Sequence, residues 1–238
     1  MLYEYETVAS TNLIAANLEP WTAVRADTQT SGRGRFQRTW VSDLGGLWLS
    51  AVVPLGEGEI HRRALPLAAG LAICNGLHDL GISEVRLRWP NDVLVHGRKL
   101  AGLLIDQFVA GRAVVGIGLN VKNQPEKCDP NLANHVRRLA DLLSNPPELP
   151  DLARLLLAHL KRVVIELADN GSPSLSLRIN KLWGVPRTVE LDLNGRLCRG
   201  TFTGVDSEGR LILVDHSGTQ SFYDAHEVRH LTELHCLP

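Results

Sequence analysis

The chain is short of cysteine and has no long apolar run. Its four cysteines stand far apart in the sequence, at Cys74, Cys128, Cys198 and Cys236. None forms a CxxC pair, so neither a zinc site nor a redox pair is expected. The most apolar long stretch, residues 64–77, is interrupted by Pro66 and Asn75, and the first residues are acidic where a signal peptide would be basic. We therefore expect a cytoplasmic protein with no membrane span.

A surplus of one charge is also missing. The 25 Lys and Arg against 26 Asp and Glu give a formal net charge of −1, which predicts no nucleic-acid partner. Lysine itself is scarce, because only five of the 25 basic residues are lysines, and this draws attention to Lys99. The 238 residues, 44% hydrophobic and 21% charged, allow one large domain or a large domain with a small appendage.

Residues 26–40 place three arginines and two glycines between apolar runs. We expect an exposed loop there, because this composition does not suit a buried strand, with short strands at 21–24 and 47–53 on either side. Gly32 and Gly34 would permit positive φ, and arginine carries planar donors that match a carboxylate or a phosphate. The alternative interpretation is a solvated basic turn or a nucleic-acid tether. The three arginines are Arg33, Arg35 and Arg38.

The apolar periodicity predicts helices and strands in one large first domain, residues 1–184. A strand pair joined at Gly97 should form a hairpin, and Pro90 should break its first strand. A further buried strand is expected at 113–121, and a loop at 122–134. Helices are expected at 13–18 (capped by Ser or Thr), 61–80, 136–143, 149–167 and 175–183.

After Gly184 and Pro186 the apolar period changes to two. Short strands separated by tight turns are typical of a small all-β module. We therefore place a second domain at residues 185–238. Its strands are expected at 188–193, 196–206, 211–214 and 220–223.

Five motifs, in this order and spacing, resemble those of the biotin protein ligases. The resemblance covers most of the chain, and the combination is far more specific than any single motif. Residues 199–209 are in addition similar to the SH3-like end module of that family. The motifs are Ser10-Thr11-Asn12, residues 29–35 (QTSGRGR) with Arg38 and Trp40, residues 88–92 (RWPND), residues 98–102 (RKLAG) and residues 116–121 (GIGLNV).

The resemblance implies an α+β fold. Its first domain would be a catalytic domain with a mixed sheet, similar to class II aminoacyl-tRNA synthetases, and a small SH3-like β-barrel would follow. Some members of the family carry an amino-terminal DNA-binding domain. Because the first motif begins at residue 10, we expect that domain to be lacking here.

The resemblance also implies a two-step ligase. Biotin and MgATP would give biotinyl-5′-AMP, which would then acylate one lysine of a biotin carboxyl carrier protein of the acetyl-CoA carboxylase type. The implied catalytic residues are Lys99, Arg35 and Asp92, with Asp92 also a candidate Mg²⁺ ligand. The implied biotin-binding residues are Ser10, Thr11, Asn12, Gln29, Gly32, Arg33, Arg35, Lys99, Gly102, Gly116 and Gly118. The implied ATP-binding residues are Arg35, Arg38, Trp40, Asn91, Asp92, Lys99 and Asn120.

The chain departs from the family pattern at a few positions. Gln37 stands where glycine is common, Asp43 where proline is common, and Arg88 where lysine is usual. Adenine contacts in residues 122–135 stay open, as do the acceptor protein and the formation of a homodimer. Two further interpretations remain, a lipoate-ligase-like adenylating enzyme and a biotin-binding protein without catalysis.

Overall fold

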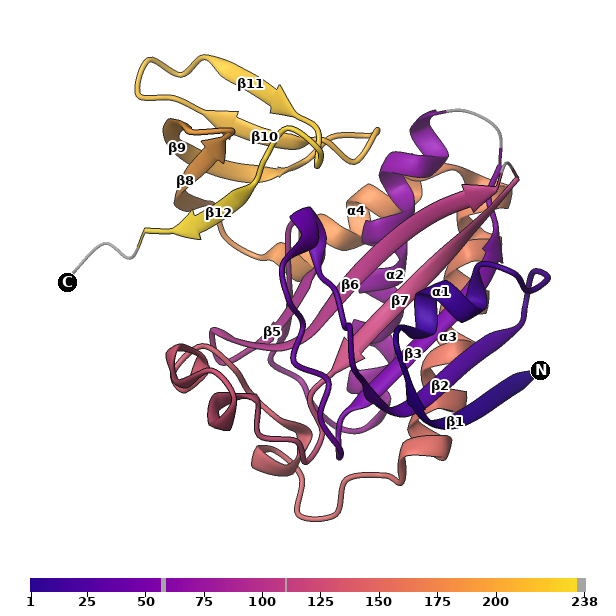
Figure 1. The fold of residues 1–238 in the computed structure, drawn as a ribbon. Helices are drawn as coiled ribbons and strands as arrows, with labels where there is room; N and C mark the ends of the chain where they lie inside the picture. The colour runs from indigo at the N-terminus through magenta and orange to yellow at the C-terminus, as the bar shows by residue number, and fades with distance from the viewer. Residues whose placement is uncertain (57–58, 110, 235–238) are drawn as a thin grey trace.

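The computed structural model describes residues 1–56, 59–109 and 111–234, so Cys236 and the end of the expected second domain lie outside the described residues. The described chain forms an α+β fold with two sheets (Figure 1). The larger sheet has seven strands in the order β1-β2-β3-β7-β6-β5-β4. Its strands are β1 (Leu2–Val8), β2 (Ala23–Gln29), β3 (Leu47–Pro54), β4 (Val85–Arg88), β5 (Asp92–Val95), β6 (Arg98–Val109) and β7 (Arg112–Leu119).

This larger sheet is mixed, as expected. Strand β1 pairs with β2 in parallel, and every other neighbouring pair is antiparallel. The β5–β6 hairpin turns at His96 and Gly97, which both have positive φ (51° and 74°). Two consecutive left-handed residues match the right-handed twist of the strands they join. The turn between β4 and β5 falls at residues 89–91, where Pro90 was expected to break the strand.

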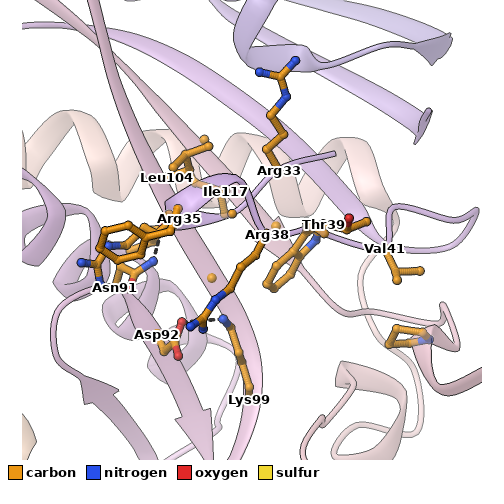
Figure 2. Close-up of a pocket in the computed structure, with 18 of the residues that line it drawn as sticks. Arg33, Arg35, Arg38, Thr39, Val41, Asn91, Asp92, Lys99, Leu104 and Ile117 are labelled. Carbon is orange, nitrogen blue, oxygen red and sulfur yellow. Dashed lines mark hydrogen bonds and ion pairs between the residues drawn. The ribbon is translucent and has the colours of Figure 1, made fainter. Parts of the chain in front are cut away.

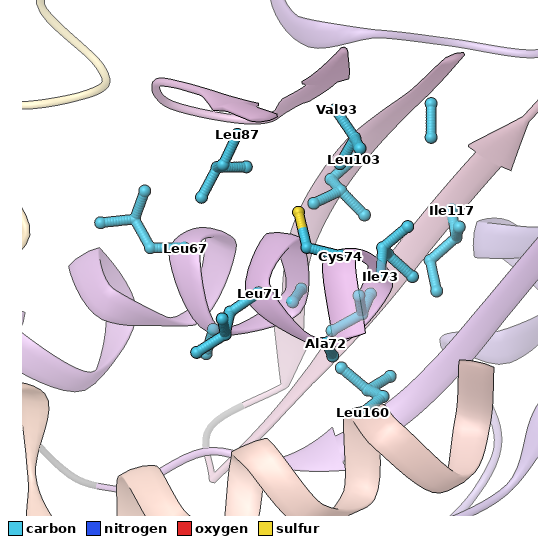
Figure 3. Close-up of a cluster of buried hydrophobic side chains, with 14 of the residues drawn as sticks. Leu67, Leu71, Ala72, Ile73, Cys74, Leu87, Val93, Leu103, Ile117 and Leu160 are labelled. Carbon is cyan, nitrogen blue, oxygen red and sulfur yellow. The ribbon is translucent and has the colours of Figure 1, made fainter. Parts of the chain in front are cut away.

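Helices cover one face of this sheet and bury the main core. They are α2 (Glu59–Asp79), α3 (Leu149–Asn170) and α4 (Ser172–Trp183). Figure 3 shows α2 side chains such as Ile73 and Cys74 between Leu103 and Ile117 of the sheet and Leu160 of α3. The pKa of the buried Cys74 thiol rises to about 12, because burial disfavours the thiolate. Within the described residues, no helix has the length and apolar character to cross a membrane.

Of the α-helices in the described residues, only the short α1 (Thr11–Ala15) lies on the opposite face of the sheet. Ala15 packs there against Val24, Val52 and Val114, which form a second, smaller apolar cluster. Ser10 takes the N-cap position of α1, although its side chain makes no capping hydrogen bond with the described residues.

The smaller sheet is antiparallel, with the strand order β11-β10-β9-β8-β12. We call residues 185–234 the C-terminal module. It packs against the rest of the protein and shares the main apolar core with it. Asn180 of α4 donates to the Val205 carbonyl at 2.9 Å and accepts from the Val205 N–H at 2.8 Å. The strands are β8 (Arg187–Leu193), β9 (Arg196–Val205), β10 (Leu211–Val214), β11 (Gln220–Tyr223) and β12 (His230–Glu233).

Three expectations about local structure were wrong. Residues 26–29 belong to β2, because β1 pairs with this strand as far as Gln29, whereas β3 pairs with it only as far as Ala26. Residues 136–143 form only the short 3₁₀ turn Leu139–Asp141. The start of this segment runs alongside Lys99 instead, where the Arg137 N–H donates to the Lys99 carbonyl oxygen at 2.8 Å. Neither Gly32 nor Gly34 has positive φ, and the left-handed residues of that loop are Phe36 and Gln37.

Candidate functional site

A cavity of about 610 Å³ lies over the open face of the large sheet, within the size range of small-molecule sites. Its floor comes from β6 and β7, and its walls come from the start of α1, the β4–β5 turn and the loop after β7. Residues 228–231 of the C-terminal module complete the rim. Segments that are distant in sequence therefore meet in this one cavity.

One wall is a short hairpin, residues 32–40, that we call the arginine tongue. Trp40 N donates to Gly32 O at 3.0 Å, Arg33 and Thr39 form a bridge, and Gly34 N donates to Arg38 O at 2.7 Å. Gly32 is required for steric reasons. A Cβ at that position would lie 2.3 Å from Ser42 Oγ and 2.5 Å from the Trp40 carbonyl oxygen.

The cationic end of the cavity is built around Asp92. Lys99 Nζ lies 2.6 Å from Asp92 Oδ1, and Arg88 Nη2 lies 2.6 Å from Oδ2. Burial by itself would raise the pKa of the Asp92 carboxyl, but the charges and hydrogen bonds of Lys99 and Arg88 outweigh burial and hold that pKa below its usual value. The carboxylate therefore stays ionised and holds Lys99 in place.

The three tongue arginines point in different directions. Figure 2 shows the guanidinium of Arg38 extending toward Asp92 and Lys99, while Arg33 extends away from them and Arg35 lies beside Asn91. Arg35 Nη2 donates to the carbonyl oxygens of Ala225 and Val228 in the C-terminal module. Burial lowers the pKa of Arg35, with the charge of Arg38 acting in the same direction and Asp92 opposing it.

Polar groups form a cradle at the other end of the cavity, and we call Thr11, Asn12 and Gln29 the polar cradle. Gln29 Oε1 accepts from Thr11 N at 2.8 Å and lies 3.0 Å from Thr11 Oγ1. Gln29 Nε2 in turn donates to Ser42 Oγ at 2.9 Å. Ser10 lines the cavity beside these residues. These amide and hydroxyl groups can both donate and accept, as recognition of a neutral polar ligand requires.

Trp40 lies over the glycines of the floor. Gly102 and Gly118 are paired across β6 and β7, and a Cβ on either would come within 2.8 Å or 2.6 Å of the indole ring. Lys99 Nζ lies 4.8 Å from the centre of the Trp40 ring. The buried indole Nε1 has no partner among the described residues, so it is a donor available to a ligand.

An apolar wall comes from the loop after β7, where adenine contacts were left open. Pro125, Leu132 and Val136 line the cavity there. Asn120 is 2% exposed, and its Oδ1 accepts from Asn123 Nδ2 at 3.0 Å. This wall and the Trp40 ring provide flat apolar surfaces suited to a heterocycle.

All of the expected site residues except Gly32 line this cavity. Whether each contacts the expected ligand stays a prediction. Sequence reasoning missed the contribution of the C-terminal module, residues 228–231, because its strand β12 was not recognised. His230 stands out among them, since burial and the charges of Arg38 and Arg88 lower its pKa despite opposing carboxylates.

The residues of the cavity fit a magnesium ion only if the phosphates of a ligand supply most of its coordination. Within the described residues, no group of three or more His, Cys, Asp or Glu side chains could hold a metal. Both oxygens of Asp92 are already paired with cations. Mg²⁺ often binds through one carboxylate together with substrate phosphates, which matches a single carboxylate in a cationic site.

The chain is similar to known proteins in both sequence and structure. The family described as Biotin/lipoate A/B protein ligase family matches residues 5–122. Biotin--[acetyl-CoA-carboxylase] ligase of Mycobacterium tuberculosis is 35% identical over 214 residues, which are 87% of this chain and 77% of that protein. Bifunctional ligase/repressor BirA of Bacillus subtilis is 27% identical over 219 residues, and the match covers 88% of this chain and 66% of BirA. The chain thus spans just under two thirds of the BirA sequence.

Among solved structures, biotin protein ligase from Aquifex aeolicus in complex with biotin and ATP has a TM-score of 0.86 at 24% identity, covering 98% of this chain and 99% of that one. The chain therefore shares the fold of that structure, an α+β fold with two sheets. By sequence, the chain belongs to the biotin/lipoate A/B protein ligase family.

Proposed function

We propose that this protein is a biotin–[acetyl-CoA-carboxylase] ligase, a carbon–nitrogen ligase that uses biotin and ATP. The observation that carries the proposal is the polarity of the cavity over the large sheet. A neutral polar cradle lies at one end, and a cluster of Lys99, Arg38 and Arg88 around Asp92 lies at the other. Biotin has a neutral ureido group at one end and a carboxylate at the other, and ATP brings the phosphates that the cations would meet.

In the first step a biotin carboxylate oxygen attacks the α-phosphorus of ATP, and pyrophosphate leaves. Two anions must approach each other, so fixed positive charge lowers the barrier if it faces the charge that develops in the transition state. Lys99 and Arg38 supply that charge, and Asp92 keeps the Lys99 ammonium oriented. A magnesium ion on the phosphates would add further positive charge, and Asp92 is the carboxylate placed to reach it. Arg35 would join the carboxylate and the α-phosphate after leaving its carbonyl partners.

In the second step a lysine amine of the carrier protein attacks the acyl carbon, the amide bond forms and AMP leaves. Asp92 is a poor base for the amine proton, because its pKa is held low and both of its oxygens are paired. The departing AMP phosphate is therefore the favoured proton acceptor. Trp40 and the apolar wall of Pro125, Leu132 and Val136 would hold the adenine ring.

Incubation with biotin, MgATP and a biotin carboxyl carrier domain tests the proposal. The expected result is pyrophosphate release that depends on biotin, together with a gain of one biotinyl group in the mass of the carrier. Lipoic acid in place of biotin is the matched control, since it shares the carboxylate and an apolar chain but lacks the ureido group. Faster adenylation of lipoic acid would favour the lipoate ligase, and binding of biotin without pyrophosphate release would indicate a non-catalytic binding protein.

A further inference from the structure

A chain of hydrogen bonds, buried at Ser50 and partly buried at Asp106, lies behind the polar cradle and ties α1 to two strands. Asn12 Nδ2 donates to Asp106 Oδ2 on β6 at 2.7 Å. On the other side of the amide, Ser50 Oγ of β3 lies 2.5 Å from Asn12 Oδ1 and 2.6 Å from Thr11 Oγ1. The amide of Asn12 is thus held from both ends, and Thr11 is held through the same serine.

Ser50 and Asp106 differ from the cradle residues because neither lines the cavity, whereas Thr11, Asn12 and Gln29 do. Ser50 is 0% exposed, and every other residue of its strand β3 is apolar. A buried hydroxyl destabilises the folded protein unless it is hydrogen bonded. A serine in such an apolar strand therefore indicates that its hydrogen bonds have a function. Its bonding partners are two residues of the cradle.

Gly116 supports the same arrangement from below. A Cβ at this position on β7 would lie 2.4 Å from Asn12 Oδ1, so only glycine lets the Asn12 amide lie this close to the strand. The family resemblance implied that Gly116 binds biotin directly. The space above it is taken by Asn12 instead, which places the cradle residue against the floor of the cavity.

We propose that Ser50 and Asp106 are positioning residues for the ureido head of biotin. This inference rests on the proposed function. Thr11, Asn12 and Gln29 face the ligand, and Ser50 and Asp106 act through Thr11 and Asn12 by fixing where their donors and acceptors point. A preorganised cradle binds more tightly than one that must be ordered on binding, so the contribution of this pair lies in biotin affinity and not in the chemistry at the phosphates.

The test measures biotin binding by calorimetry and pyrophosphate release by steady-state kinetics for Ser50→Ala and Asp106→Ala. Each variant is expected to raise the Kd and KM for biotin by about tenfold, the effect of losing one buried hydrogen bond, with kcat and the KM for ATP unchanged. Desthiobiotin keeps the ureido group, so its Kd should rise by the same factor in both variants. Asp106→Asn should restore binding, since an amide oxygen can still accept from Asn12.

Ser176→Ala is the matched control for removing a buried serine hydroxyl. Ser176 is 6% exposed, and its hydroxyl donates to the carbonyl oxygens of Ser172 and Asp206, outside the cavity. This variant should lower thermal stability and leave biotin affinity unchanged. A loss of biotin affinity in Ser176→Ala equal to that in Ser50→Ala would mean that the effect is general loosening, and would overturn the assignment.

Unchanged biotin affinity in folded Ser50→Ala and Asp106→Ala would also overturn the positioning role of these two residues. In that case biotin binding by the wild-type protein would still support the proposed function. If Ser50→Ala does not fold, the Asp106→Ala and Asp106→Asn pair decides alone, because Asp106 is only partly buried whereas Ser50 is fully buried. Failure of the wild-type protein to bind biotin would overturn the proposed function itself.

Discussion

The guanidinium of Arg35 donates a hydrogen bond of 2.9 Å to the carbonyl oxygen of Val228, which lies 193 residues later in the chain. Arg35 also donates to the Ala225 carbonyl, and the Arg229 guanidinium lies 5.6 Å from the centre of the Phe36 ring. The tip of the arginine tongue is therefore attached to the C-terminal module. For Arg35 to bind a carboxylate or phosphate, it must exchange these carbonyl partners for an anion, and the anion is the stronger acceptor.

This exchange predicts that Arg35 retains the reactive intermediate. Arg35→Ala is expected to form biotinyl-AMP but to release it about ten- to a hundred-fold more readily, because one charge-assisted contact that closes the tongue is lost. The released adenylate would acylate lysines of unrelated proteins. A filter assay for free adenylate, run with a bystander protein, measures both effects.

Arg86→Ala is the control for loosening of the C-terminal module alone. Arg86 pairs with Glu233 of β12 at 2.7 Å and is not among the cavity residues. If Arg86→Ala released as much adenylate as Arg35→Ala, docking of the module would be the cause. If Arg35→Ala retained its adenylate as tightly as wild type, Arg35 would not close the site.

Lys99 is expected to act mainly in adenylate formation. Lys99→Ala removes the ammonium 2.6 Å from Asp92 and leaves the carboxylate paired only with Arg88, so repulsion between biotin carboxylate and phosphates rises. Removal of a preorganised charge typically lowers kcat by about 10²–10³-fold. Pyrophosphate release reports this step directly, and transfer from added biotinyl-AMP to the carrier should fall much less. A wild-type rate of pyrophosphate release would exclude Lys99 from adenylation.

The Lys99–Asp92 pair also predicts how stability depends on pH. The folded-state pKa of Asp92 lies below its unfolded value of about 3.9. The pair therefore contributes stability above that value, and the contribution is lost as the pH falls through the folded-state pKa. In Lys99→Met, only Arg88 still opposes the effect of burial on the Asp92 carboxyl. The pKa of Asp92 should therefore rise, and the loss of stability in acid should begin at higher pH. Urea unfolding from neutral to acid pH tests this, and Lys127→Met is the control. Acid limbs that coincide for wild type and Lys99→Met would contradict the prediction.

Two neighbouring glycines of the tongue are expected to respond differently to alanine. A Cβ at Gly32 would lie 2.3 Å from Ser42 Oγ and 2.5 Å from the Trp40 carbonyl, and a backbone atom cannot move aside at little cost. A Cβ at Gly34 would meet its nearest atom, Arg38 O, at 3.7 Å, an ordinary contact. Gly32→Ala should therefore lower kcat/KM for biotin by about tenfold or more, as displaced site residues do, and Gly34→Ala should not. Equal losses would mean that backbone flexibility, and not close packing, is what the glycines provide.

The sequence predicted the helices that carry long apolar periods and missed the elements that depend on partners. The apolar residues of helix α3 recur at helical spacing, so its buried face can be read from the sequence. Strand β1 is exposed along most of its length and forms because it pairs with β2. The pocket motifs were recognised because each carries unusual chemistry. Ser50 was not, since one serine in an apolar strand acquires meaning only when Thr11 and Asn12 fold onto it. The same holds for Val228, which reaches the cavity only through docking of a second sheet.

The backbone at Gln37 explains why glycine suits this position in the family. Gln37 has a φ of 59° and follows Phe36 at 55°, so two residues with side chains occupy the left-handed region in the turn of the tongue. Such a conformation costs about 1–2 kcal/mol per residue, and glycine avoids it. Glycine also adds freedom to the unfolded chain, worth roughly 0.5–1 kcal/mol in the opposite direction. Gln37→Gly is thus expected to raise the free energy of unfolding by up to about 1.5 kcal/mol, the difference between the two effects.

Phe36→Gly is the informative comparison for this gain. It relieves the same backbone strain but removes the ring that lies under Arg35 (4.9 Å) and Arg229 (5.6 Å), so its net effect should be near zero or destabilising. Urea unfolding of both variants gives the two free energies, and adenylate retention shows whether the tongue still closes. Destabilisation by Gln37→Gly would mean that the left-handed turn carries no strain. Stabilisation by Phe36→Gly equal to that by Gln37→Gly would mean that the ring contributes nothing to docking of the tongue on the C-terminal module.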